Sequence, residues 1–200
     1  MVDKARKDEV VKCFSSLLQV HNGYDDEAVP NAGKTSIAAA EAFLQFTRGH
    51  HQSLDDVVGD AAEDDSGGRM IVVKDVDFCS LCRNHLLPFF GKVHIGYLPE
   101  GGKMLQSSKI AQVVDVLSHR LQEQEKLTEE IAQAVAGRIS SPSVGVIVEA
   151  THLGFTVRGA ETTTSSMITV TTSCMLAKFR EDQRTRNEFL LLVKKPKRRC

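Results

Sequence analysis

The order of two hydrophobic patterns constrains the fold of this 200-residue chain more than any other feature. Two strand-like segments lie in residues 70–98, where Val93, Ile95 and Tyr97 alternate with polar or small neighbours. Residues 144–179 hold two further segments rich in β-branched side chains, and two helical segments separate these pairs. This order predicts an α+β domain in which antiparallel strand pairs flank a helical hairpin.

The helical segments each have one apolar face. In Ser108–Gln122 and in Lys126–Ile139, apolar residues recur every three or four positions, which is the period of an α-helix. The apolar residues of these two faces are Ile110, Val113, Val114, Leu117 and Leu121, and then Leu127, Ile131, Ala134 and Val135. A shorter helix is expected at Arg184–Val193, close to the end of the chain.

The first part of the chain reads as a helical arm followed by a linker. Residues 3–20 have a helical pattern, and "HNGYDDEAVPNAGK" then interrupts it with Gly, Pro and Asn. Ser36 is expected to cap a second helix. We therefore expect an arm and linker at residues 1–35, a main domain at 36–194 and a basic tail at 195–200.

Composition limits the expected partners and compartment. The formal net charge of -1 gives no general reason to expect nucleic acid, and no apolar run reaches the roughly 20 residues of a membrane span. The start "MVDKARKDEVVKCF" lacks the apolar centre of a secretory signal. Five cysteines at irregular spacing favour a reducing compartment. We expect a cytoplasmic protein without a nucleic-acid or membrane partner.

The segment "FCSLCRNHLLPFF" places Cys79, Cys82 and His85 at the spacing of metal ligands. A catalytic zinc takes about three protein ligands and keeps one position for water. Because Cys82 and His85 are three positions apart, a single turn can direct both toward one ion. From the spacing alone two interpretations are open: part of a zinc site completed from elsewhere in the fold, or a buried thiol and a histidine with other partners.

Several longer segments resemble the GTP cyclohydrolase I family, in that family's order and spacing. They are "HLLPFFGKVHIGYLP", "SSKIAQVVDVLSHRLQEQEKLTEEIA", "GVIVEATH", "VRG" and "FREDQRTRNEFL", and the resemblance extends from about Ser36 to Val193. It implies the tunnelling fold, in which ββααββ subunits close into a ring and two rings stack as a homodecamer. It also implies zinc sites between subunits that convert GTP to formate and 7,8-dihydroneopterin triphosphate, the first step of tetrahydrobiopterin or folate synthesis.

The resemblance implies that several retained residues contact the substrate. Gln124 and Glu125 match the family's guanine-reading pair, and a carboxylate suits the hydrogen-donating edge of guanine. Ser108 and Lys109 match a Ser-Lys pair on the triphosphate side of the site. Arg158 matches a phosphate-binding arginine.

The same resemblance gives a mixed result at the catalytic and metal positions. His152 matches the histidine that donates a proton to the purine and later to the ribose. Cys82 and His85 match two zinc ligands, but the position of the third, a cysteine in the family, holds Gly154. Asn84 replaces the first of two tandem histidines, and an amide cannot titrate near neutral pH.

Two charged positions also differ from the family. Arg83 stands where the family has a glutamate, and Gln112 replaces a triphosphate-binding arginine, which removes a positive charge and a bidentate donor. Cys79 is a candidate substitute zinc ligand, and Cys174 is a weaker one. The alternative for Cys79 is a side chain that points away from Cys82 on a strand and packs as a small apolar group.

These matches leave two main functions open, besides a pure interaction module that would use the family's animal-type regulatory face. One is GTP cyclohydrolase I activity with a zinc site rebuilt from Cys79, Cys82 and His85. The other is a catalytically degenerate paralogue that keeps the ring and serves as a scaffold, regulatory or nucleotide- or pterin-binding subunit. Its partners would be an intact paralogue, to whose sites it lends Lys109 or Arg158, or a feedback regulatory protein. The replaced residues favour little zinc and little release of formate by the homomer.

Overall fold

The computed structural model describes residues 4–22, 31–63, 67–99, 102–157 and 169–194. The chain divides into two compact units, Met1–Arg48 and Gly49–Cys200. Within the described ranges, no helix is both long enough and apolar enough to cross a membrane.

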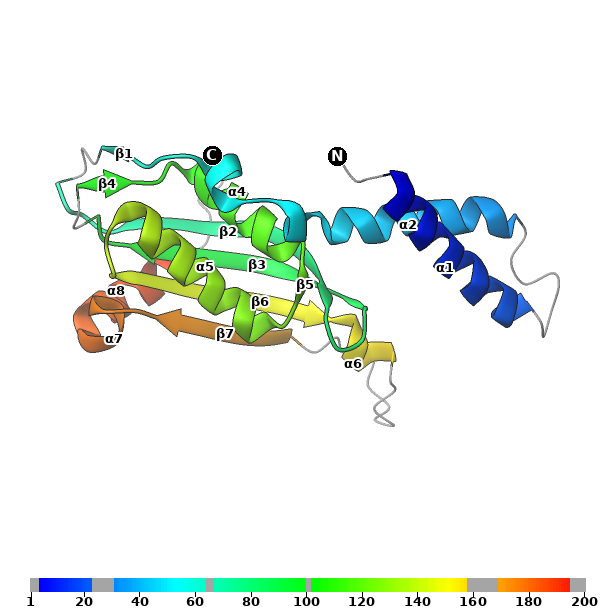
Figure 1. Ribbon diagram of the computed structural model, residues 1–200. Coiled ribbons are helices and arrows are strands. Elements are labelled where there is room, and N and C mark those ends of the chain that lie inside the picture. The colour runs from blue at the N-terminus through cyan, green and yellow to red at the C-terminus, as the bar shows by residue number, and fades with distance from the viewer. Residues whose placement is uncertain (1–3, 23–30, 64–66, 100–101, 158–168, 195–200) are drawn as a thin grey trace, which may run out of the picture. The chain divides into compact units, whose positions relative to one another are not determined.

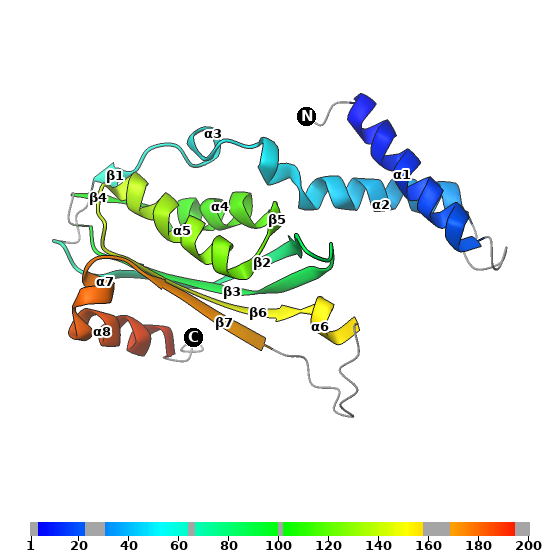
Figure 2. The same cartoon turned by 60° about the horizontal axis from the view of Figure 1, so that its bottom comes forward.

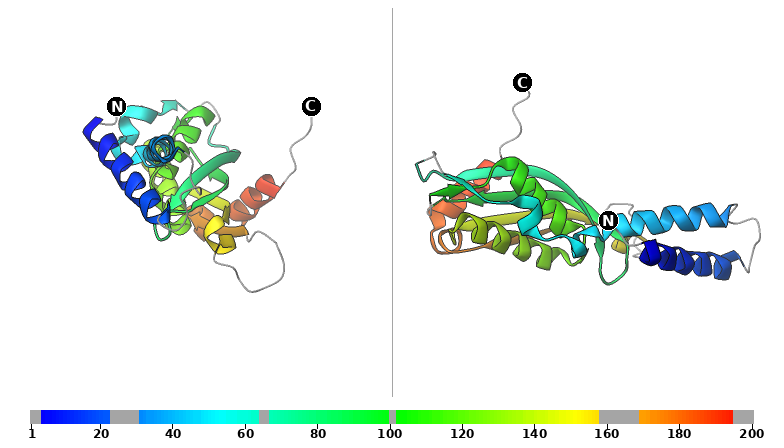
Figure 3. Two further views of the ribbon diagram at one scale, coloured as in Figure 1. Left: turned by 90° about the vertical axis from the view of Figure 1, so that its right-hand side faces the viewer. Right: turned by 45° about the horizontal axis from the view of Figure 1, so that its top comes forward.

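The first unit is a pair of helices, α1 (Lys4–Asn22) and α2 (Ala32–Phe46). The two helices run side by side in the right-hand view of Figure 3. The rings of Phe14 and Phe43 meet edge to face, with centroids 6.2 Å apart. Aromatic contact therefore joins the two helices. The helix predicted at residues 3–20 is present as α1.

The beginning of α2 differs from the prediction. The helix starts at Ala32, after Asn31 in a left-handed conformation with φ 64°. Ser36 is buried inside the helix, and its hydroxyl donates a hydrogen bond to the carbonyl of Ala32 at 2.7 Å. The predicted cap at Ser36 is therefore wrong, because Asn31 can take the left-handed turn that starts the helix earlier.

The second unit is built on a five-stranded sheet of order β5-β2-β3-β6-β7 (Figure 1). The strands are β2 (Ile71–Cys82), β3 (Pro88–Tyr97), β5 (Leu121–Gln122), β6 (Val144–His152) and β7 (Thr169–Met175). Neighbours from β2 to β7 are antiparallel, and only the short β5 is parallel to its neighbour. The expected antiparallel α+β architecture is confirmed, with both strand pairs joined in one sheet through β3 and β6.

Helices cover both faces of this sheet, as Figure 2 shows. The helices α4 (Ser107–Ser118) and α5 (Gln124–Ile139) lie on one face, and α7 (Lys178–Glu181) and α8 (Gln183–Lys194) lie on the other. Most members of the predicted apolar faces of α4 and α5 are fully buried: Ile110, Val113, Val114, Leu117, Leu127, Ile131 and Val135. The first predicted helix was too long at its end, because Leu121 pairs with Leu81 in the sheet instead.

The remaining elements are too short for a periodic sequence pattern to reveal them. They are η1 (Arg48–His51), α3 (Leu54–Val58), β1 (Ala62–Glu63), β4 (Lys103–Met104) and α6 (Leu153–Val157). The strands β1 and β4 form a separate antiparallel pair.

Two facing glycines allow α7 and α8 to approach the sheet closely. Gly96 of β3 is paired with Gly145 of β6. A Cβ on Gly96 would lie 2.5 Å from the ring of Phe189, and a Cβ on Gly145 would lie 2.6 Å from the ring of Phe179. Phe179 and Phe189 are fully buried and meet edge to face at 5.4 Å. The two rings thus fill the space that side chains at these glycines would take.

A bulge in β2 supplies a hydrogen bond to a buried histidine. The pairing of β2 with β3 shifts between Val73 and Val76, and Asp75 in this bulge has φ 60°. The backbone N–H of Asp75 donates to Nδ1 of His94 at 3.1 Å. His94 is only 3% exposed, and burial lowers the pKa of its imidazole.

Candidate functional site

The turn between β2 and β3 brings together the two retained ligand residues. The backbone N–H of Leu86 donates to the carbonyl of Cys82 at 2.8 Å, and the N–H of Cys82 donates to the carbonyl of Leu87 at 2.9 Å. The chain therefore reverses within a few residues. In this turn, Sγ of Cys82 lies 3.5 Å from Nδ1 of His85.

Gly154 lies beside this pair. It follows the end of β6 by two residues, in the short helix α6, and it is buried. A Cβ on Gly154 would lie 3.4 Å from Nδ1 of His85. The position that the resemblance gives to a third zinc ligand therefore faces His85, but it offers no side-chain donor atom.

Neither of the two candidate cysteines replaces that ligand. Side chains of a strand alternate between its faces, so Cys79 and Cys82, three positions apart in β2, point to opposite faces. Burial also raises the pKa of the Cys79 thiol, which favours its protonated form. Cys174 is paired with Val146, far along β6 from His152. No group of three or more His, Cys, Asp or Glu side chains suited to a metal occurs among the described residues. The donor set does not fit a three-ligand zinc.

A cavity of about 170 Å³ opens beside the turn. It collects the candidate residues from four elements of the second unit. Those that line it are Cys82, Asn84, His85, Gln124, Glu125, His152 and Gly154. The structure therefore brings the proposed ring-reading, proton-transfer and metal positions together at one end of the sheet.

Gln124 occupies the centre of a hydrogen-bonded group at the base of this cavity. It opens α5 and is only 2% exposed. Its Nε2 donates to the carbonyls of Val148 at 3.0 Å and Val170 at 2.9 Å, and lies 3.2 Å from the hydroxyl of Thr172. Its Oε1 lies 2.7 Å from Nε2 of His152. The side-chain amide of Gln124 is thus engaged by β6 and β7.

His152 is held on its ring face as well as at its edge. The imidazole stacks on Phe89 with centroids 4.7 Å apart and an angle of 6°, and Phe155 lies 5.5 Å away on a tilted plane. Burial lowers the pKa of His152, although the negative charge of Glu125 acts in the opposite direction. His152 is therefore neutral in the resting site near pH 7.

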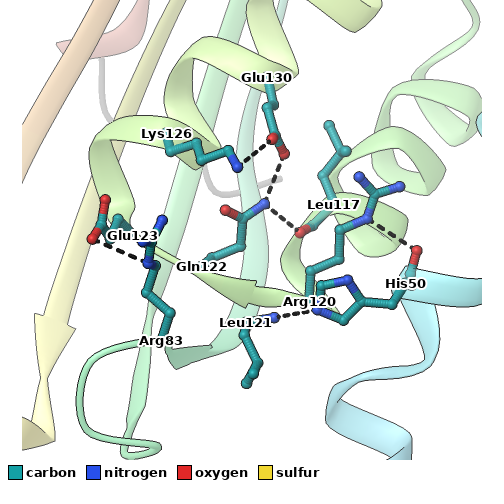
Figure 4. A network of polar contacts seen from close by, with 10 residues as sticks. His50, Arg83, Leu117, Arg120, Leu121, Gln122, Glu123, Lys126 and Glu130 are labelled. Atoms are coloured by element: carbon teal, nitrogen blue, oxygen red, sulfur yellow. Dashed lines mark hydrogen bonds and ion pairs between the residues drawn. The ribbon is translucent and has the colours of Figure 1, made fainter.

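Glu123 contacts both replaced residues of the β2–β3 turn. Nε of Arg83 lies 3.4 Å from Oε1 of Glu123 (Figure 4). Nδ2 of Asn84 donates to the same oxygen at 3.3 Å. Glu123 also lines the cavity. Sequence reasoning missed this residue, although its acidic side chain directly precedes Gln124. The reversed charge at position 83 was the signal that a carboxylate would lie nearby.

A second polar group fixes the segment that carries Glu123 (Figure 4). Gln122 donates through Nε2 to the carbonyl of Leu117 at 3.1 Å and to Oε2 of Glu130 at 2.8 Å. Arg120 donates through Nε to the carbonyl of Gly49 at 3.0 Å. These bonds anchor the connection from α4 to α5, so the start of α5 has a defined place beside the cavity.

The residues expected on the phosphate side lie elsewhere. Ser108, Lys109 and Gln112 belong to the first turns of α4 and do not line the cavity. The ammonium group of Lys109 donates to the carbonyl of Asp60. Arg158 lies outside the described residues.

The distance between Lys109 and the cavity follows from the length of α5. Arg138, near the end of α5, donates to the carbonyl of Gly59, the neighbour of the Asp60 carbonyl that Lys109 contacts. Gln124 opens the same helix beside the cavity, 14 positions earlier. At roughly 1.5 Å per residue, this separation is about 21 Å. A single chain therefore does not bring Lys109 to its own cavity.

The architecture is an α+β domain in which one antiparallel sheet carries a helical hairpin on one face, consistent with a tunnelling fold. Its sequence matches the family model described as GTP cyclohydrolase I over residues 12–194. The chain belongs to the GTP cyclohydrolase I family.

Named relatives support this membership. The chain is 44% identical over 180 residues to GTP cyclohydrolase 1 of Methylococcus capsulatus, which covers 90% of this chain and 94% of the relative. It is 46% identical over 161 residues to GTP cyclohydrolase 1 of Homo sapiens, covering 80% of this chain and 63% of the relative. For the protein of the same name from Drosophila melanogaster, 47% identity over 160 residues covers 80% of this chain and 48% of the relative. The chain thus spans less than two thirds of the human and fly relatives.

Proposed function

We propose that this chain is a GTP cyclohydrolase I family subunit that binds a guanine-type or pterin-type ring in its cavity but does not hydrolyse GTP by itself. One observation carries the proposal: Gly154 faces His85 at the position of the third zinc ligand and supplies no donor atom. A second loss adds to it, because Asn84 cannot move a proton as a histidine would. Such a role is typically worth about 10²–10⁴ in rate.

The cavity nevertheless retains groups suited to ring binding. Guanine and pterin share a 2-amino-4-oxopyrimidine edge that donates two neighbouring hydrogen bonds. Glu125 lies in the lining and accepts such bonds when it is ionised. It also stands in the first turn of α5, where the helix dipole favours a negative charge. These features support ring recognition that does not need a metal.

The exposed edges of the sheet support a ring-shaped oligomer. β7 forms one edge, and in the described part of the chain β2 is covered on its outer side only by the two residues of β5. Unpaired strand edges are ready to pair with a second copy. Assembly of this kind would also bring Lys109 of one subunit toward the cavity of another, since within one chain Lys109 lies near the far end of α5 from that cavity. We propose the decamer of the family as the assembled form.

A second candidate function follows from the same separation. In a mixed ring with an intact relative, this chain would supply Lys109 to a neighbouring complete site without needing a complete site of its own. GTP would then be converted to 7,8-dihydroneopterin triphosphate at the sites of the relative. We place both forms of the subunit in the cytoplasm, in tetrahydrobiopterin or folate synthesis, where a feedback regulatory protein is a further candidate partner.

The deciding experiment measures zinc content, formate release from GTP and ring binding on the purified full-length protein. We expect much less than one zinc per chain, no formate above the background, and saturable binding of guanosine in calorimetry. Glu125→Gln should weaken this binding, while Glu129→Gln, an exposed change one turn further along α5, should leave it unchanged. Stoichiometric zinc that disappears in Cys79→Ser, together with formate release, would establish the rebuilt enzyme instead.

The mixed ring needs a separate experiment. The chain and an intact relative are expressed together, purified through a tag on this chain, and assayed for formate release. Recovery of the relative in the same particle, with turnover that falls in Lys109→Ala of this chain, would support the second function.

A further inference from the structure

We infer that Gln124 is a positioning residue that holds His152 in the tautomer with hydrogen on Nε2, so that the cavity presents the lone pair of Nδ1 to its ligand. The identity of that ligand rests on the proposed function, whereas the tautomer does not. This role differs from direct ring reading, which the resemblance gives to Gln124.

The orientation of the Gln124 amide follows from its surroundings. One end of the amide lies 3.0 Å from the carbonyl of Val148 and 2.9 Å from the carbonyl of Val170. Both carbonyl oxygens are acceptors, so this end must be the NH₂ group. The reversed amide would place its oxygen against these two carbonyl oxygens and lose both hydrogen bonds in a buried site. The carbonyl oxygen of Gln124 therefore faces His152.

The tautomer of His152 follows in turn. An oxygen of Gln124 at 2.7 Å from Nε2 requires a hydrogen on that nitrogen. A neutral imidazole carries only one such hydrogen, so Nδ1 holds a lone pair. The stack on Phe89 opposes a tilt of the ring out of this plane. Within the described residues no hydrogen bond joins Nδ1 to the protein, and His152 lines the cavity, so Nδ1 is the nitrogen left for a ligand.

The charged groups of the cavity lining are hydrogen-bond acceptors, like Nδ1 of His152. Glu123 and Glu125 are acceptors when ionised, and no Lys or Arg occurs among the described residues of the lining. The two carboxylates and Nδ1 of His152 favour a ring that donates hydrogen bonds and is itself uncharged. A reduced pterin fits this description, because it combines the 2-amino-4-oxopyrimidine edge with additional ring N–H groups.

The tautomer is measured directly by nitrogen-15 NMR of histidine-labelled full-length protein near pH 7.5. The His152 signals are identified by their loss in His152→Gln. We expect the pattern of a neutral ring protonated at Nε2 in the unmodified protein. Gln124→Met, which keeps the volume but removes the amide, should give mixed tautomers. Thr128→Val is the matched control: it removes a buried hydroxyl that bonds the backbone carbonyl of Gln124 and the side-chain hydroxyl of Thr172, but it leaves the carbonyls of Val148 and Val170 to anchor the amide.

The ligand class is tested by calorimetry with 6-methyl-7,8-dihydropterin and 6-methyl-5,6,7,8-tetrahydropterin. The tetrahydro form carries two more hydrogens, on N5 and C6, and so offers one more ring N–H. We expect the tetrahydro form to bind roughly 3- to 10-fold more tightly, and this preference to disappear in Gln124→Met but not in Thr128→Val. Hydrogen on Nδ1 in the unmodified protein would overturn the positioning role, even if Gln124→Met does not fold. Equal or reversed preference for the two pterins would overturn the ligand class. Failure of both pterins and guanosine to bind would contradict the proposed function, whereas the tautomer is read without any ligand.

Discussion

Gly154 and His85 face one another so closely that a Cβ on Gly154 would lie 3.4 Å from Nδ1 of His85. The fold has thus kept the place of a third ligand while the sequence has removed its donor. The gap is chemical rather than geometric, because a side chain at position 154 would start beside His85, whose Nδ1 lies 3.5 Å from Sγ of Cys82.

The first prediction restores that donor. Gly154→Cys should raise zinc binding toward one ion per chain, because a thiolate at this position completes a set of two sulfur ligands and one nitrogen ligand. Zinc is measured by atomic emission after dialysis. Gly154→Ser, of similar size but a poor zinc ligand, is the control. Equal zinc in both variants would contradict the account of the site.

The second prediction adds the proton-transfer group to the restored site. Gly154→Cys with Asn84→His should release formate from GTP, whereas Gly154→Cys alone should release far less. The expected ratio is about 10²–10⁴, the usual contribution of a positioned acid or base. A double variant that binds zinc but is no faster than the single variant would show that Asn84 is not the missing group.

The third prediction concerns the triphosphate. Gln112→Arg should strengthen GTP binding by roughly 1.5–3 kcal/mol, because the arginine adds a charged hydrogen bond to phosphate. Guanosine, which lacks phosphate, should bind the variant and the unmodified protein equally in calorimetry. If GTP affinity does not change, Gln112 does not face the phosphates in the assembled protein.

The fourth prediction uses the two facing glycines. Gly96→Ala should destabilise the fold by about 1–3 kcal/mol, because the added methyl group would lie 2.5 Å from the buried ring of Phe189. Gly137→Ala in α5 is the opposite case: nothing lies within 4 Å of a Cβ there, and alanine favours a helix by roughly 1 kcal/mol. Urea denaturation of both variants measures the difference. Similar stability for the two would contradict the close packing of α8.

The fifth prediction concerns pH. Burial lowers the pKa of both His94 and His152, so the unfolded chain binds more protons than the folded one once the pH falls below the ordinary histidine value of about 6.5. The contribution of these two histidines to the free energy of unfolding should therefore be complete above that pH, and it should be lost as the pH falls below it. For His94, burial outweighs the opposing charges of Glu149 and Asp75.

Denaturation at pH 7.5 and 5.5 checks this prediction. His94→Asn keeps an acceptor for the N–H of Asp75 but cannot be protonated, so its stability should change less between the two pH values. A variant with the same pH dependence as the unmodified protein would exclude His94 as a contributor.

The sequence predicts those parts of the structure that depend on residues close together in the chain. The apolar faces of α4 and α5 and the alternation in β3 predict their elements, because each depends on a repeat within one segment. The spacing of Cys82 and His85 likewise predicts their meeting, since one turn joins them. The start of α2 was misplaced because Asn31 and Ser36 are both plausible from residue type alone.

Relationships between distant segments could not be predicted in this way. The amide of Gln124 is anchored by Val148 and Val170, which belong to two other elements, so its engagement depends on how α5 packs on the sheet. The separation of Lys109 from the cavity has the same origin, because it depends on the direction of α4 relative to α5. The family resemblance implied roles for Gln124 and Lys109, but it did not show whether both residues of one site come from the same chain.

The contact of Arg83 and Asn84 with Glu123 has a consequence for how this turn responds to its solution. In a metal-bound site, a chelator would release such a turn and ordinary salt would not. Here the partners are exposed charges and an amide, and mobile ions screen exposed charges over about 10 Å at 0.1 M ionic strength. We therefore expect the position of this turn, and with it the rim of the cavity, to respond to ionic strength.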